Sequence, residues 1–206
     1  MVILLLVNAS NISATQAVKS KYSLDVDGGS DHLNVGDIDF GTSDFSISMW
    51  IKAVAFDSSF QNLFSKYEDD NNRVDLYIDD SNGLYAVIRG GGNIVGNHQP
   101  GVALGSGDLA AGKWIHVVYT IDRSDGSTGE VFYVNGSPHG SASAADHSSQ
   151  TLDNTGDISI GAFNQGSGSA FEGQIDEPPG DIVELATICG LIDDPTEAVE
   201  VGCMRS

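Results

Sequence analysis

The stretch from Gly112 to Gly136 constrains the fold more than any other part of the chain, because it has the pattern of two strands and a turn. Between Trp114 and Asp122 apolar side chains recur at every second position, as in a strand with one buried face. A glycine-bearing turn, Asp125–Gly129, leads to a second strand, Glu130–Val134, and Asn135-Gly136 is a further turn signal. The pattern predicts a hairpin with Ile115, Val117, Tyr119 and Ile121 in a core, and with Trp114, His116, Val118 and Thr120 on the opposite face.

A second hairpin is predicted around the turn Asp79–Gly83, between the strands Arg73–Ile78 and Leu84–Arg89. Closing it with that five-residue loop pairs Ile78 with Leu84 and Leu76 with Ala86, and both pairs then face the core. The opposite face carries Tyr77 beside Tyr85, Asp75 beside Val87, and Arg73 beside Arg89.

Strand patterns account for much of the remaining sequence. Asp44–Lys52 alternates, with Phe45, Ile47, Met49 and Ile51 on one face and Ser46, Ser48, Trp50 and Lys52 on the other. Further strands are predicted at Phe60–Tyr67, Gly156–Phe163 and Ala170–Glu177, and two short ones in Tyr22–Val35 around a Gly-Gly turn. The Gly-rich stretch Gly90–Gly107 and the small-residue stretch Ser137–Thr155 are predicted to be irregular.

These segments resemble laminin-G-like (concanavalin A-like) domains. DFSISMWIK at Asp44–Lys52 is similar to the family's D-F-T-I-S-A-W-V-K, and the Gly112–Gly136 stretch to its W-x-H-V-x-x-T-x-D…V-x-x-Y-V-[ND]-G centre. The resemblance covers about residues 21–177 and implies an all-β, antiparallel jelly-roll sandwich. Residues 1–20 are then an N-terminal segment and residues 178–206 an atypical tail, because Pro178-Pro179 ends the resemblance.

The two ends of the chain leave alternatives open. Met1–Val7 is apolar and fits either a buried first strand, which we favour slightly, or the remnant of a signal peptide. In the tail, Asp181–Ile192 has the spacing of a short amphipathic helix. Cys189 and Cys203 could form one disulfide in an oxidising compartment or stay free.

Charge excludes some partners. The chain has 29 acidic and 9 basic residues and a formal net charge of −20. Such a surface repels phosphate backbones and anionic lipid, so neither nucleic acid binding nor membrane insertion is expected. The same composition fits either an ordinary soluble, secreted protein or one adapted to high salt, where the repulsion between carboxylates is screened.

A metal site is implied by the resemblance, since relatives often use Ca²⁺ to tie the opening of the domain to its last strand. The matching positions are Asp27 and Asp176, with Asp31 and nearby carbonyl groups as helpers. Hard cations prefer several oxygen ligands, including carboxylates held by a turn. The alternative is that these aspartates only shape turns and strand ends.

Catalysis is not expected. The glucanases that share this sandwich carry E-x-D-x-x-E or E-x-D-x-E on one strand, and this chain has neither string and no G-x-S-x-G motif. The best predicted ligand surface combines aromatic and charged groups that suit a sugar: Arg73, Asp75, Tyr77, Tyr85 and Arg89.

By this resemblance we expect a non-catalytic carbohydrate-binding or adhesion module, supported by Ca²⁺ and placed outside the cell or on its surface. Its partner would be a glycan or a surface protein. The alternatives are a structural or protein-interaction module of a cell-surface or virion assembly and, less favoured, a degenerate glycoside hydrolase.

Overall fold

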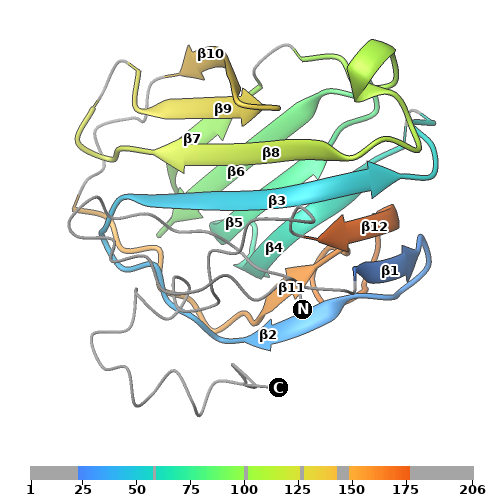
Figure 1. Ribbon diagram of the computed structural model, residues 1–206. Helices are drawn as coiled ribbons and strands as arrows, with labels where there is room; N and C mark the ends of the chain where they lie inside the picture. The colour runs from blue at the N-terminus through green and yellow to red at the C-terminus, as the bar shows by residue number, and fades with distance from the viewer. Residues whose placement is uncertain (1–22, 58, 100–101, 126–127, 143–148, 177–206) are drawn as a thin grey trace, which may run out of the picture.

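The computed structural model describes residues 23–57, 59–99, 102–125, 128–142 and 149–176, which form two antiparallel sheets packed face to face (Figure 1). Sheet A has the strand order β1-β12-β3-β8-β9-β10, and sheet B has the order β2-β11-β4-β5-β6-β7. The strands are β1 Leu24–Asp27, β2 Leu33–Gly36, β3 Phe45–Ala53, β4 Gln61–Asp69, β5 Asn72–Ile78, β6 Leu84–Gly90, β7 Asn93–His98, β8 Ile115–Ile121, β9 Glu130–Val134, β10 Ser137–Ala142, β11 Ile158–Ile160 and β12 Glu172–Asp176, with a 3-10 turn, η1, at Gly107–Leu109.

The predicted all-β sandwich is confirmed, and so is the face assignment of its central strands. The six side chains expected in the core are at most 2% exposed: Ile47, Met49, Ile51, Ile115, Val117 and Tyr119. They pack with apolar side chains of sheet B such as Phe64, Leu76 and Ile88. Because one residue of slippage would move every side chain to the other face, this burial establishes the register of β3 and β8.

Both predicted hairpins form, β8 with β9 and β5 with β6, and the second has the predicted residue partners. In β5 and β6, Ile78 lies opposite Leu84, Tyr77 opposite Tyr85 and Arg73 opposite Arg89. The turn between β9 and β10 has positive φ angles at Asn135 (49°) and Gly136 (79°). Such angles at both central residues match the right-handed twist of a two-residue hairpin.

The structure differs from the sequence prediction at one edge of each sheet. β7 lies in the stretch predicted to be irregular at Gly90–Gly107, and β10 lies in the one predicted at Ser137–Thr155. Glycine and small polar residues have weak strand preferences, but the free edges of β6 and β9 offer backbone partners to these segments. Tertiary context therefore decides these two strands.

The two short strands around the Gly-Gly turn also form, but in different layers: β1 pairs with β12 in sheet A and β2 with β11 in sheet B. The predictions for residues 1–20, for the helix at Asp181–Ile192 and for the two cysteines lie outside the described residues. No helix among the residues that the structure describes is long and apolar enough to cross a membrane.

Candidate functional site

The predicted ligand surface is the outer face of sheet B, where three aromatic rings form a row. Tyr77 and Tyr85 are half-buried and stack with ring centroids 5.2 Å apart and planes 18° apart. Phe60 lies on the other side of the row, 5.8 Å from the Tyr77 ring, and is 48% exposed. Burial, together with the neighbouring Tyr85 and acidic groups, raises the pKa of Tyr77 to about 12, so its hydroxyl keeps its proton.

Phe60 was missed by the sequence prediction as a member of this surface. It directly precedes β4, in which Asn62 lies opposite Tyr77. The available signal was a large aromatic residue between the polar Ser59 and Gln61. The row of Phe60, Tyr77 and Tyr85 is called the aromatic row below.

The charged end of the same face is held together by Asp75. Its side chain is only 2% exposed and accepts a hydrogen bond of 2.7 Å from the Ser65 hydroxyl. Arg73 Nε lies 3.4 Å from its other oxygen. Burial raises the pKa of Asp75 to about 6, although Ser65 and Arg73 act in the opposite direction. Asp75 therefore supports Arg73 from below and does not itself present a surface to a ligand.

Three polar atoms on this face are buried without a hydrogen-bond partner among the described residues: Asn62 Oδ1, Arg73 Nε, which has only the ion pair with Asp75, and Arg89 Nε. Asn62 is 3% exposed, and Arg89 is half-buried with its Nη1 donating to the carbonyl of Asp70 at 3.0 Å. A buried polar group without a partner costs about 1–3 kcal/mol, so proteins rarely keep one without a reason. These atoms lie at the two ends of β4–β6, Asn62 beside the aromatic row and Arg89 beside Arg73.

The predicted calcium ligands are not brought together as a pair. Asp27 lies opposite Glu172 in the β1–β12 ladder, whereas Asp176 lies opposite Trp50, four residues further along β12. At about 3.3 Å per residue this separates their backbones by roughly 13 Å. Asp27 and Asp31 are exposed, and Asp27 Oδ1 accepts the Gly29 N–H at 2.9 Å in a local turn.

A calcium ion shared by Asp27 and Asp176 therefore does not fit this register. Asp27 and Asp31 do line one hollow, together with the acids Asp25 and Glu172. Across the described parts of the chain, no group of three or more His, Cys, Asp or Glu side chains is positioned to hold a metal ion. Calcium binding stays a prediction, which a lowered melting temperature in EDTA would support.

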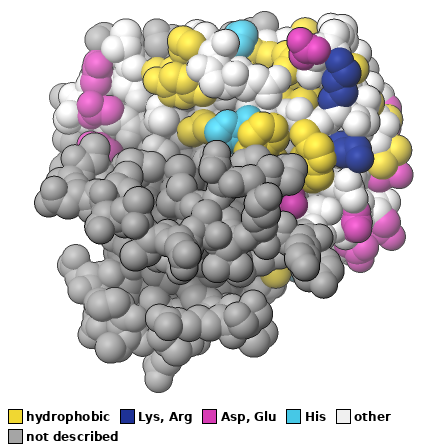
Figure 2. Space-filling model, viewed as in Figure 1, with side chains coloured by type: hydrophobic (Ala, Val, Ile, Leu, Met, Phe, Trp, Pro, Cys, Tyr) yellow, Lys and Arg dark blue, Asp and Glu magenta, His cyan; other side chains and the backbone are white. Residues whose placement is uncertain are grey.

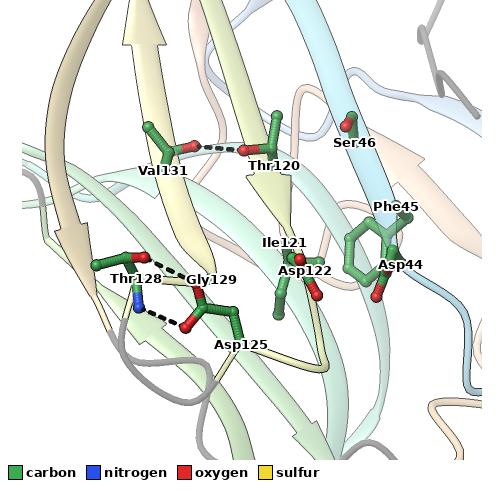
Figure 3. A pocket seen from close by; sticks show the side chains of 10 residues that line it. All are labelled: Asp44, Phe45, Ser46, Thr120, Ile121, Asp122, Asp125, Thr128, Gly129 and Val131. Carbon is green, nitrogen blue, oxygen red and sulfur yellow. Dashed lines mark hydrogen bonds between the residues drawn. The ribbon is translucent and has the colours of Figure 1, made fainter. Parts of the chain in front are cut away.

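A second acidic hollow, of about 250 Å³, lies at the ends of β3, β8 and β9 (Figure 3). Its carboxylates already have local donors: Asp44 accepts from the Arg123 N–H, Asp122 from Ser124 and Asp125 from Thr128. These bonds hold Asp122–Asp125 and Thr128 next to the start of β3. The hollow thus has a structural explanation.

Two further buried acids, Glu130 and Asp79, are held by structural partners. Glu130 is fully buried between the sheets, where it accepts hydrogen bonds from the Tyr119 hydroxyl (2.7 Å) and the Asn97 N–H (3.1 Å). Burial raises the pKa of Glu130. Asp79 closes the β5–β6 turn by accepting from Ser81, Gly83 and Gln99.

Comparison with known proteins identifies the family. The model of the concanavalin A-like lectin/glucanases superfamily, of laminin-G type, matches residues 27–178. The chain belongs to this superfamily. A search of curated proteins finds no match.

Several solved structures share the fold. The CBM40 domain of the Ruminococcus gnavus IT-sialidase, bound to α2,6-sialyllactose, has a TM-score of 0.53 at 15% identity, covering 82% of this chain and 96% of that chain. The binding domain of Paraclostridial Mosquitocidal Protein 1 has a TM-score of 0.52 at 18% identity, covering 92% and 51%. Leech intramolecular trans-sialidase has a TM-score of 0.53 at 15% identity, covering 84% of this chain and 27% of that one. At these identities the similarity concerns the fold.

Proposed function

We propose that this protein is a non-catalytic carbohydrate-binding module that acts outside the cell or on its surface. The proposed glycan site is the outer face of sheet B. The aromatic row supplies apolar ring surface at one end, and Arg73 and Arg89 supply donors at the other. Family membership and the glycan-bound CBM40 domain of the same fold support this choice.

One observation carries the proposal: a partly exposed aromatic row shares the outer face of sheet B with two arginines, Arg73 and Arg89. A sugar can contact both kinds of group, because its C–H faces pack on aromatic rings and its hydroxyl groups donate and accept hydrogen bonds. The guanidinium groups of Arg73 and Arg89 could donate to hydroxyl oxygens of a sugar that packs on the aromatic row.

The absence of catalysis is part of the proposal. A glycosidase needs two carboxyl groups on either side of the scissile bond, about 5–10 Å apart. On this face Asp75 is buried beneath Arg73, and the Asp79 carboxylate is occupied by its own turn. Neither carboxyl group is therefore placed to serve as one of the two catalytic carboxyl groups of a glycosidase.

A glycan array tests the proposal, followed by titration of the best ligand. We expect Tyr85→Ala to weaken binding on the order of tenfold, because an aromatic contact contributes about 0.5–1.5 kcal/mol beyond its area. The matched control is Tyr133→Ala, a half-buried tyrosine on the outer face of sheet A. Failure of every glycan to bind the wild type would reject the proposal and favour a protein-interaction module.

A further inference from the structure

Among the residues that the structure describes, the cations at the surface are not scattered. Of the six described Lys and Arg residues, Lys66 and Arg123 are buried, with 0% and 1% exposure. The other four lie as two pairs. Arg73 and Arg89 are on the outer face of sheet B, and Lys52 and Lys113 are at one end of the outer face of sheet A. Each pair shares its face with stacked or adjacent aromatic rings.

The aromatic groups of sheet A line an open groove of about 540 Å³. Trp50 and His116 are partners across β3 and β8, and their rings stack with centroids 4.9 Å apart and planes 16° apart. Trp114 lies beside them, with the Lys52 ammonium 5.9 Å from its ring centroid. Figure 2 shows hydrophobic, His and Lys or Arg side chains gathered on this side of the molecule. The groove lining is Trp50, Asp108, Lys113, Trp114, His116, Asn135 and Gly136.

Polar groups of the groove offer mainly donors. Asn135 Oδ1 already accepts the His116 N–H at 2.9 Å, so its side-chain amide has N–H groups left for a ligand. Lys113 pairs with Asp108 at 3.1 Å, but both side chains are more than half exposed, and such a pair is weak enough to be replaced. Burial lowers the pKa of His116, whose Nε2 lies 2.9 Å from the Ser48 hydroxyl.

We infer that this groove is a second saccharide site, which takes a sugar that carries a carboxylate. Tryptophan rings receive the C–H face of the sugar, and Lys113 and Asn135 receive its anionic and hydroxyl oxygens. That the ligand is a saccharide rests on the proposed function. Since the two outer faces point away from each other, one module would bind two glycan chains at once and could cross-link them.

The net charge of −20 does not prevent this. At physiological ionic strength the Debye length is about 8 Å, so acids on distant surfaces are screened. The carboxylate of a bound sugar would be governed by the groups in the groove, Lys113 with Asp108 and the neighbouring Lys52.

The test uses the two tryptophans, which are the only two in the chain and both line the groove. Their indole N–H signals in a ¹⁵N spectrum therefore report on this site, while amide signals of Tyr77 and Tyr85 report on sheet B. We expect α2,6-sialyllactose to shift both indole signals in a saturable way, and lactose, which lacks the carboxylate, to shift them at least tenfold more weakly. Unmoved indole signals at millimolar sialyllactose would overturn the inference.

Variants separate the second site from the first. Lys113→Glu, an exposed substitution, should weaken the indole response on the order of tenfold and leave the Tyr77 and Tyr85 signals unchanged. Tyr85→Ala should leave the indole response unchanged and weaken the response of the Tyr77 amide signal. Shifts confined to sheet B would refute the second site and keep the proposed function. Shifts confined to the indoles would support the second site and contradict binding of this glycan at sheet B. Beads coated with sialyllactose should be bridged by the wild type but by neither variant, and bridging by Lys113→Glu would contradict two-sided binding.

Discussion

Lys66 and Asp75 lie on the neighbouring strands β4 and β5, both buried, yet they are satisfied very differently. The Lys66 ammonium donates to the carbonyl groups of Asn154 and Gly156 at 2.8 Å each and to the Asp37 carboxylate, with Asp39 at 3.6 Å. Asp75 has one hydroxyl donor and an arginine at 3.4 Å, and its pKa stays raised to about 6.

The difference distinguishes a charge with a structural role, Lys66, from a charge beneath the proposed binding face, Asp75. Lys66 ties β4 to two distant segments, one before β3 and one before β11, and every contact it makes is internal. Asp75 lies under Arg73, near atoms that still lack partners. A buried charge is tolerated when its partners replace water, and Asp75 meets that condition only in part.

The largest effect is expected from Lys66→Met, which keeps the aliphatic stem and removes the ammonium. Two buried carbonyl groups and Asp37 would lose their donor, so the free energy of unfolding should fall by about 3–5 kcal/mol. Urea denaturation at pH 7 measures this. Lys113→Met, at an exposed pair, is the control and should cost less than about 1 kcal/mol. A similar small loss for both variants would contradict the structural role of Lys66.

A smaller effect of opposite sign is expected from Asp75→Asn. Between pH 4 and pH 6 folded Asp75 holds a proton that the unfolded chain has released, since the pKa is raised from 3.8 to about 6. The cost of burying the ionised Asp75 carboxylate therefore shrinks, and the free energy of unfolding rises, as the pH falls from 7 toward 4. At pH 7 the asparagine variant avoids burying a charge and still accepts from Ser65, so we expect a gain of about 1–3 kcal/mol.

Denaturation at pH 7 and pH 5 measures this difference, which should shrink at the lower pH. Comparing the variant with the wild type at each pH cancels the titration of the other acids. A loss of stability at pH 7 would show that the ion pair with Arg73 outweighs the burial of Asp75.

Salt is expected to change the stability difference between the wild type and the Lys66→Met variant least. The Debye length falls from about 30 Å at 0.01 M to about 3 Å at 1 M, which screens the exposed acids of a chain with net charge −20. The melting temperature of the wild type should therefore rise with NaCl, while the cost of Lys66→Met stays nearly constant, because buried pairs are screened little. A flat wild-type curve would remove the argument for a high-salt habitat.

Much of the fold could be predicted because its central strands are locally consistent. In β5 and β6 the alternation, the turn Asp79–Gly83 and the pairing of Tyr77 with Tyr85 all agree, so the register follows from the sequence. The edge strands β7 and β10 could not be predicted, because their backbone partners come from β6 and β9 rather than from their own residues.

The candidate site divides in the same way. Sequence alternation determined which side chains share the outer face of sheet B, because the period of a strand is two. Tertiary structure decided what each can do: it buried Asp75, added Phe60 to the row, and left Asn62 Oδ1 without a partner. It also placed Asp27 opposite Glu172, at one end of β12, and Asp176 at the other end of that strand. Burial and pairing depend on segments distant in sequence, such as the loop whose Asn164 N–H reaches Ser65, and no local pattern records them.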